Sequence, residues 1–239
     1  MGFLFPKKMH FFLDPQFDPK IGTLNPEESK HAARVLRLKE GDTIFIGDGG
    51  GVQYTAEISQ ISKQDVKVNV LEKKGFPKPL HHVTVAISPT KNLSRFEWFL
   101  EKATELGVSE IIPLISRRTE RTRIKEERSE KIILNAAKQS QRAFIPRLHP
   151  TTGFEELLIS EHKNGLIAHC IDDKMRATVG VNPEGSESLI LIGPEGDFTL
   201  EEVELAEKKG FKGVILNENR LRTETAGILA VAMLQMSLR

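Results

Sequence analysis

The spacing of apolar residues changes its period near residue 75, and this change divides the chain into two parts. Before it, apolar and polar residues alternate, as in Val52–Ile58, which is the pattern of half-buried strands. After it, short apolar runs alternate with segments of helical spacing. The stretch Lys73–Pro79 has neither period and contains Gly and Pro, so it indicates a linker. We therefore expect two domains, at residues 9–74 and 80–239.

The first part is predicted to be a small β-rich domain or barrel with one helix. Its expected strands are Met9–Leu13, Ile44–Ile46, Val52–Ile58 and Val66–Val70. The run Gly47–Gly51 is typical of a hairpin turn. Asn25 can cap the helix, Pro26 suits its first position, and Glu28 completes the spacing of a capping box. The residues of this helix expected to face the interior are Ala32, Val35 and Leu36.

The second part is predicted to be a parallel α/β sheet, because strands and helices alternate along it. The expected strands are Val83–Ile87, Ile111–Ile115, Leu166–Cys170, Leu189–Ile192 and Val214–Leu216. Ser94 with Glu97, and Thr199 with Glu202, have the spacing of capping boxes. The helices that these pairs begin are expected to stop at Gly107 and Gly210, and two further helices are expected at Glu127–Gln141 and Thr225–Leu238.

Composition excludes several classes of protein. Lys and Arg total 34 and Asp and Glu total 33, so any nucleic-acid binding needs a local basic patch rather than an overall charge. The single cysteine, Cys170, rules out intrachain disulfides and Cys-cluster metal sites and fits a reducing, cytoplasmic location. The histidines lack the spacing of metal ligands, so no metal is expected. No apolar run approaches the roughly 20 residues that span a bilayer, so no membrane partner is expected. Met1–Lys8 is too short for a secretory signal.

Two loops are candidates for the chemistry of the second part. Gly193–Thr199 and Asn217–Thr225 each follow a predicted strand directly, at the edge where open α/β sheets bind ligands. Glycine in such a loop lets the backbone approach a ligand closely. The alternatives are a plain strand-to-helix turn for the first loop and a polar connection for the second. The paired arginines of the second loop favour a ligand site.

Three clusters of basic and amide residues suit the binding of phosphate groups. One is the run Arg117–Lys125, with five cations and a single acid, and the others surround Lys91 and the stretch Lys138–Arg142. The alternative for any one such cluster is a solvated face. Three clusters in one half of the chain favour nucleic acid.

The motifs of this chain resemble those of the RsmE family. They are Val35–Leu38 before Gly41-Asp42, Thr90–Asn92, Glu101–Val108, Lys138–Ser140, Gly193–Gly196 and Leu221–Ala226, in the family's order from Met9 onward. The resemblance implies a PUA-like RNA-binding β-barrel followed by a SPOUT domain, a parallel α/β fold with a trefoil knot. It also implies a homodimer that uses S-adenosyl-L-methionine to methylate N3 of a uridine in 16S ribosomal RNA of the small subunit.

The resemblance places the cofactor at three strand ends. The residues it implies are Ala168, His169, Cys170, Ile192, Gly193, Pro194, Glu195, Gly196, Leu216, Asn217, Arg220, Leu221, Arg222 and Thr225. The chain departs from the family twice. Asn217 stands where glycine is usual, and asparagine tolerates a left-handed backbone better than most residues. Asp197 stands where glycine is common and adds a carboxylate near the site.

Methylation of uridine N3 requires the loss of its proton, which a base assists and a nearby cation favours. Arg222 is the expected cation, and Glu195 or Glu224 is expected to hold the cofactor or accept the proton. The alternative for both acids is the stabilisation of a helix N-terminus. The expected RNA-binding residues are Arg34, Arg37, Lys91, Arg95, Arg117, Arg118, Gln139 and Arg142.

Other functions remain open from the sequence. One is a different SPOUT methyltransferase that acts on a ribose 2′-hydroxyl or on transfer RNA. Another is a non-catalytic assembly factor that binds ribosomal RNA. A dinucleotide-dependent oxidoreductase is disfavoured because the chain has no Gly-x-Gly-x-x-Gly fingerprint.

Overall fold

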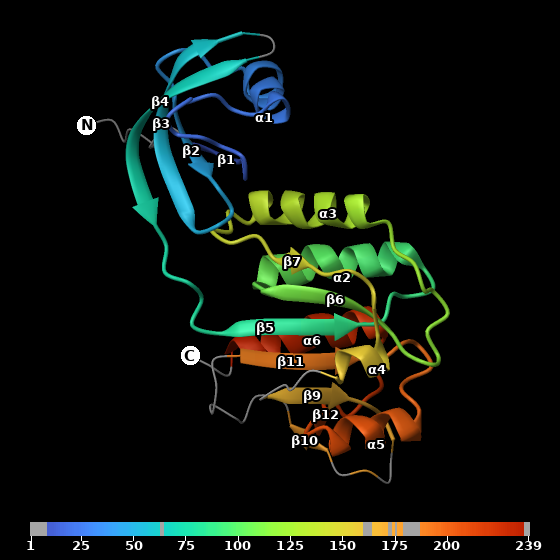
Figure 1. Ribbon diagram of the computed structural model, residues 1–239. Helices are drawn as coiled ribbons and strands as arrows, with labels where there is room; N and C mark the ends of the chain where they lie inside the picture. Colours follow the sequence, from blue (N-terminus) through green and yellow to red (C-terminus); the bar gives the residue numbers. More distant parts are fainter. Residues whose placement is uncertain are drawn as a thin grey trace, which may run out of the picture. The chain divides into compact units, whose positions relative to one another are not determined.

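The computed structural model describes residues 9–62, 65–159, 164–171, 174, 176–178 and 187–236. The chain divides into two compact units. Unit 1 runs up to Lys78 and also contains Ala137–Ile145, and unit 2 contains Pro79–Ala136 and the chain from Pro146 onward. Helix α3 (Glu126–Gln139), which is labelled in Figure 1, therefore begins in unit 2 and ends in unit 1. The two units are described separately below.

Unit 1 contains a four-stranded sheet in the order β1-β2-β3-β4. Its strands are β1 (His10–Leu13), β2 (Thr43–Gly47), β3 (Val52–Ile61) and β4 (Val66–Gly75). β1 pairs with β2 in parallel, and the other neighbours are antiparallel. Alternate residues of β3 point into the core, where Tyr54, Ala56 and Ile58 are buried. The alternation in the sequence thus corresponds to one buried face.

The helix of unit 1 begins as the sequence predicts and ends differently. In α1 (Pro26–Lys30) the Asn25 side chain accepts a hydrogen bond from Glu28 N at 2.9 Å. The chain then continues as the π-helix η1 (His31–Val35). A π-turn has more residues than an α-turn, so helical spacing no longer predicts which face is buried. Ala32 is buried, but the prediction for Val35 is wrong, because its side chain is 67% exposed.

The predicted linker also begins too early. Strand β4 continues through Gly75, which pairs with Val52 of β3. The end of β4 is exposed on both faces, so its residues show no alternation between apolar and polar. Backbone pairing alone maintains the strand there, and periodicity does not detect pairing.

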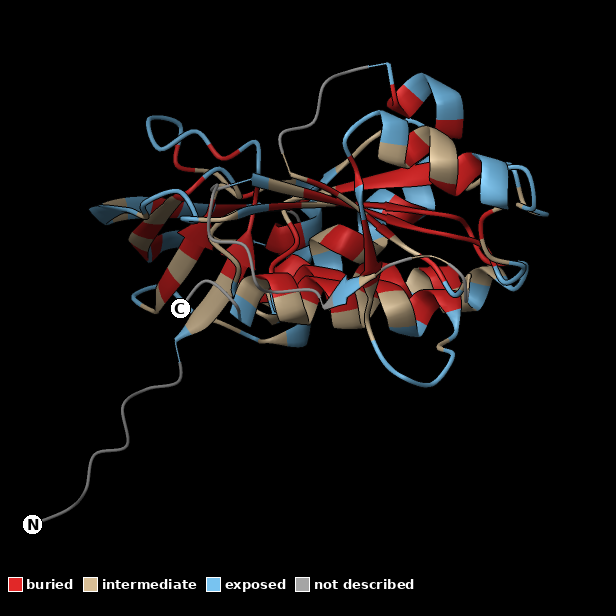
Figure 2. Ribbon diagram, turned by 90° about the horizontal axis from the view of Figure 1, so that it is seen from below, coloured by how far each residue is buried: buried red, intermediate tan, exposed pale blue. Residues whose placement is uncertain are grey.

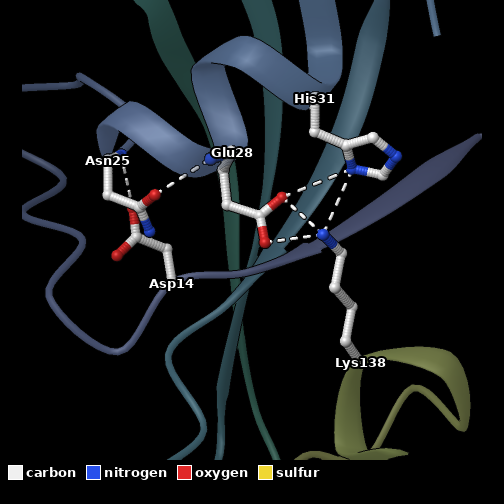
Figure 3. A network of polar contacts seen from close by, with 5 residues as sticks. All are labelled: Asp14, Asn25, Glu28, His31 and Lys138. Carbon is white, nitrogen blue, oxygen red and sulfur yellow. Dashed lines mark hydrogen bonds and ion pairs between the residues drawn. The ribbon is translucent and has the colours of Figure 1, made fainter. Parts of the chain in front are cut away.

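The segment Ala137–Ile145 is joined to unit 1 by the anchor network, which consists of Glu28, His31 and Lys138 (Figure 3). Lys138 Nζ lies 2.6 Å from both carboxylate oxygens of Glu28 and donates to His31 Nδ1 at 3.2 Å. The Glu28 side chain is 7% exposed and that of Lys138 is 22% exposed. The predicted helix Glu127–Gln141 stops two residues early, because Gln141 adopts a left-handed backbone with φ 52°.

Unit 2 is built on a parallel sheet in the order β10-β12-β9-β11-β5-β6-β7, with β8 beside β6. Its strands are β5 (His82–Ile87), β6 (Glu110–Ile115), β7 (Arg147–Leu148), β8 (Thr152–Gly153), β9 (Gly165–Ala168), β10 (Ala177–Thr178), β11 (Glu187–Ile192) and β12 (Lys212–Ile215). Every pair of neighbours in it is parallel. The sequence predicted the parallel α/β class, but not the short strands β7, β8 and β10.

Helices cover both faces of this sheet. Its helices besides α3 are α2 (Leu93–Leu106), α4 (Phe154–Leu157), α5 (Leu200–Lys208) and α6 (Thr223–Met236). One core cluster joins α4 and α5 to the strands through buried side chains such as Phe198. On the other face α6 lies so close to β5 and α2 that a Cβ on Gly227 would be 2.7 Å from Ile87 and Phe99. Figure 2 shows the central strands as buried between helices with exposed outer surfaces.

Two of the predicted caps had different outcomes. Thr199 and Glu202 form the predicted capping box of α5. The pair Ser94 and Glu97 does not cap α2, because the helix begins earlier and Asn92 accepts the hydrogen bond from Ser94 N. Gly107 ends α2 in the left-handed conformation, as expected for a C-cap glycine.

Within the described residues, none of the helices combines the length and apolar character needed to cross a membrane. The same part of the chain holds no group of three or more His, Cys, Asp or Glu side chains suited to a metal ion.

Candidate cofactor pocket

Three neighbouring strands of unit 2 end at the same edge of the sheet. β9 lies between β11 and β12, so Ala168, Ile192 and Ile215 lie at adjacent carboxyl ends. The loops that follow these strands include the two that the sequence singled out. Ligands of open α/β sheets bind at this edge, because the loops there diverge to leave a crevice.

The loops line an open cavity of about 500 Å³. Twelve predicted cofactor-binding residues line it: Ala168–Cys170, Ile192–Glu195, Leu216–Asn217 and Arg220–Arg222. Gly196 and Thr225 are not among its lining residues in the described part of the chain. The two loops that the sequence singled out, Gly193–Thr199 and Asn217–Thr225, thus both contribute residues to one cavity. The role of the lining residues in binding stays a prediction.

The loop after β11 depends on close backbone packing. A Cβ on Gly193 would lie 3.2 Å from the ring of Phe198, which is buried. Asp197 adopts a left-handed backbone with φ 64°, while Asn217 is not among the residues with positive φ. Of these two residues, the one with a strained backbone is therefore Asp197.

The cavity carries charges of both signs. Its lining includes the carboxylates of Glu195, Asp197 and Glu218 and the guanidinium groups of Arg176, Arg220 and Arg222. Arg176 was not among the residues predicted from the sequence, because it lies in a stretch without clear periodicity; it donates to His169 O at 3.2 Å.

The two predicted catalytic residues in the cavity differ in their contacts. Glu195 Oε1 accepts a hydrogen bond from Lys91 N at 2.9 Å, and Arg220 Nη2 donates to the Glu195 carbonyl at 3.3 Å. Arg222 is exposed, and its guanidinium has no hydrogen-bond or ion-pair partner among the described residues. Arg222 is thus available to an anionic group in the cavity.

His169 is a titratable group in the wall of the cavity. Burial lowers its pKa from the ordinary value of 6.5, and the charge of Asp197 acts in the opposite direction. Its Nδ1 accepts a hydrogen bond from Ile171 N at 3.3 Å, which places the proton of the neutral ring on Nε2. Nε2 is buried and has no partner among the described residues.

Glu224, the third predicted catalytic residue, lies outside the lining of the cavity among the described residues. It is 5% exposed, and its Oε1 is 3.7 Å from Arg95 Nε. Its Oε2 is buried with no partner in the described part of the chain. The geometry makes Glu224 a neighbour of Arg95 rather than of a ligand in the cavity.

The predicted RNA-binding residues of unit 2 already have partners in the protein. Lys91 Nζ pairs with Glu120 at 2.9 Å, and Arg117 Nη1 lies 3.6 Å from Glu201. Arg118 Nη1 donates to Gly196 O at 2.7 Å and so supports the loop of the cavity.

The predicted RNA-binding residues of unit 1 are more accessible. Arg34, Arg37 and Gln139 are exposed, and in the described part of the chain the two arginine side chains have no hydrogen-bond or ion-pair partner. Arg142 is partly buried, and burial lowers its pKa. Arg34 and Arg37 are therefore the freest of the predicted RNA contacts.

The chain matches two family models. Residues 76–235 match the RNA methyltransferase domain, and residues 24–71 match the RNA methyltransferase PUA domain. The fold and the cavity at the strand ends thus belong to an RNA methyltransferase with a PUA domain.

Named relatives narrow this class. The chain is 30% identical to ribosomal RNA small subunit methyltransferase E of Rickettsia conorii over 91% of this chain and 90% of that protein. A probable rRNA-methyltransferase from Porphyromonas gingivalis has a TM-score of 0.87 and 37% identity, over 97% of this chain and 100% of that chain. The ribosomal RNA small subunit methyltransferase E of Neisseria gonorrhoeae, bound to S-adenosyl methionine, has a TM-score of 0.81 and 28% identity, over 95% of this chain and 97% of that one. This chain belongs to the ribosomal RNA small subunit methyltransferase E family, the RsmE family.

Proposed function

We propose that this protein transfers a methyl group from S-adenosyl-L-methionine to N3 of a specific uridine in 16S ribosomal RNA. The observation that carries the proposal is the single cavity formed by Gly193–Thr199 and Asn217–Thr225, in a chain of the RsmE family. A solved family member holds S-adenosyl methionine, which supports the same cofactor here.

The cavity suits this cofactor in size and chemistry. Its volume of about 500 Å³ lies within the range of roughly 300–1,000 Å³ typical of small-molecule sites. Apolar residues at or just after the strand ends, such as Ile192 and Leu216, suit the adenine, and Arg176 and Arg220 suit the carboxylate of the methionine portion. When bound, the cofactor supplies an electrophilic methyl group on a positively charged sulfur.

The residues of the chain prepare the nucleotide for this transfer. Glu195 accepts the proton of uridine N3, and Arg222 stabilises the negative charge that develops on the uracil oxygens. The N3 lone pair then forms the bond to the methyl carbon, which loses its bond to sulfur. Arg222 suits this role because it is exposed in the cavity and has no other partner among the described residues.

Glu224 has a different role in this proposal. Because it is buried against Arg95, it holds that arginine in place and does not accept the proton itself. This assignment keeps Glu195 as the base and makes Glu224 a positioning residue.

RNA phosphates bind to the predicted basic and amide residues of both units. In unit 1 these are Arg34, Arg37, Gln139 and Arg142. In unit 2 they are Lys91, Arg95, Arg117 and Arg118. Affinity for RNA should therefore fall steeply with salt. The target uridine must be single-stranded or leave its stack to reach the cavity.

The wider assignment rests on the family resemblance. We assign the RNA-binding domain to residues 9–74 and the methyltransferase domain to residues 80–239. The methyltransferase domain carries a trefoil knot, and the protein works in the cytoplasm as a homodimer. Size-exclusion chromatography with light scattering would give one mass, about twice that of the chain.

The decisive experiment methylates small ribosomal subunits that lack the modification, followed by mass spectrometry of the nucleosides. The proposal expects 3-methyluridine at one position. A ribose-methylated product, or methylation of transfer RNA alone, would indicate another SPOUT methyltransferase. RNA binding without methyl transfer and without binding of the cofactor would indicate an assembly factor.

A further inference from the structure

Asp197 occupies a backbone conformation that favours glycine. Its φ of 64° lies in the left-handed region, where a side chain is strained although aspartate tolerates it better than most residues. The contacts of the Asp197 side chain indicate what this strained position does.

The Asp197 carboxylate connects two loops of the cavity. Oδ2 accepts a hydrogen bond from Cys170 N at 2.8 Å, and Oδ1 accepts one from Phe198 N at 2.8 Å. Cys170 follows β9 and Phe198 follows β11, which are paired strands. Both oxygens thus have a backbone donor, so the carboxylate is held in one orientation.

This carboxylate is also the least exposed negative charge in the described part of the cavity lining. Glu195 and Glu218 are exposed, whereas Asp197 is half-buried. Water and salt screen a half-buried charge less than an exposed one. The charge of Asp197 also reaches another lining group, because it raises the pKa of His169 against the larger effect of burial.

Among the residues that the structure describes, the formal charges of the lining cancel with Asp197 present. Three arginines and three carboxylates of this described part line the cavity, so removal of one carboxylate shifts the charge of the lining by one positive unit. S-Adenosylmethionine carries a sulfonium, an ammonium and a carboxylate, which give a net charge of +1. The product S-adenosylhomocysteine has no sulfonium and is neutral overall.

We propose that Asp197 is a specificity-determining residue, which favours the positively charged methyl donor over the neutral product in the cavity. This inference rests on the proposed function, since it concerns the same cofactor. Its consequence is weaker inhibition by the product.

Coulomb's law sets the size of the effect. For unit charges roughly 8 Å apart and an effective dielectric constant of about 40, the attraction corresponds to about a fivefold preference. The preference should decrease when salt is added, because the cavity is open to solvent.

The test measures binding by calorimetry, with the full-length protein and no RNA. The probes are S-adenosylmethionine, S-adenosylhomocysteine and sinefungin, an analogue with a charged amine in place of the methylsulfonium. Asp197→Asn keeps an oxygen that can accept one backbone hydrogen bond and removes the charge. Glu218→Gln is the matched control, because it removes an exposed carboxylate from the same lining.

We expect Asp197→Asn to weaken the binding of S-adenosylmethionine and sinefungin about fivefold relative to the binding of S-adenosylhomocysteine. Glu218→Gln should change this ratio of affinities less than twofold. Asp197→Gly, which relieves the backbone strain, should shift the ratio in the same way. Equal losses for all three probes in both Asp197 variants would overturn the inference and leave only a structural role. A wild-type protein that binds none of the probes would refute the proposed function itself.

Discussion

The anchor network of unit 1 predicts a large loss of stability when its cation is removed. Lys138→Met deletes the ammonium group that lies 2.6 Å from both oxygens of Glu28. The Glu28 side chain is 7% exposed, so its carboxylate would remain buried without its main partner. His31 Nδ1, 3.7 Å from Glu28 Oε2, is the remaining nearby nitrogen in the network.

The magnitude follows from the burial of the pair. Removal of one partner from a buried ion pair costs about 3–5 kcal/mol, because an uncompensated charge is left behind. Lys138 is 22% exposed, so water can reach part of the site, and we expect the lower end, about 3 kcal/mol. For a domain of this size such a loss lowers the melting temperature by roughly 15 °C.

Two further variants isolate the cause. In the double variant Glu28→Gln with Lys138→Met neither charge remains, so most of the loss should be recovered. Lys131→Met changes an exposed lysine of the same helix and should cost less than about 0.5 kcal/mol.

The assay must report on unit 1 alone. Hydrogen exchange of peptides from β2 and β3 reports the unfolding of unit 1. The fluorescence of Trp98, the single tryptophan, reports the unfolding of unit 2. If the double variant lost as much stability as Lys138→Met, the buried charge would not be the cause and the reasoning would be refuted.

Three further predictions follow from unit 2. Gly227→Ala places a Cβ 2.7 Å from Ile87 and Phe99. The cost of overpacking, about 1–3 kcal/mol, should exceed the gain in helix propensity of about 1 kcal/mol, so the variant should be less stable than wild type. A higher urea midpoint than wild type would contradict this. Arg222→Ala should lower the methylation rate about 100-fold and should change the cofactor affinity measured by calorimetry little. Arg222→Lys should recover part of the methylation rate. An unchanged rate in Arg222→Ala would remove Arg222 from the mechanism. Burial lowers the pKa of His169 from 6.5, so the folded protein takes up its proton less readily than the unfolded chain. The stability it supports is complete above about pH 6.5 and falls as pH decreases below that value. Urea unfolding at about pH 8 and pH 5.5 measures how much stability is lost on acidification. This loss should be smaller in His169→Gln than in wild type, and equal losses would show that His169 is not its cause.

The sequence predicted the features that depend on neighbouring residues. Alternation in Val52–Ile58 identified a strand with one buried face, and Thr199 with Glu202 identified a helix start. These signals are local, since a strand's pleat and a helix's first turn involve only a few residues. The π-helix at His31–Val35 and the exposed end of β4 escaped prediction, because neither follows a regular period.

The candidate site was partly predictable for the same reason. Both loops of the cavity follow apolar strands, and parallel strands place their carboxyl ends at one edge. Arg176 gave no signal, because its stretch has no clear periodicity. The role of Arg118 was also hidden, because its contact with Gly196 O joins residues 78 positions apart.

By itself, the sequence determined the division into a β-rich part and a parallel α/β part, the loops that could hold a ligand, and the family. Only the tertiary structure decided which charges have partners: Lys138 with Glu28, Glu224 with Arg95, and Asp197 with the backbone of Cys170. The physical reason is that hydrophobic periodicity records which face of an element is buried. The partner of a polar group depends instead on which distant segment packs beside it, and strand order and helix packing decide that.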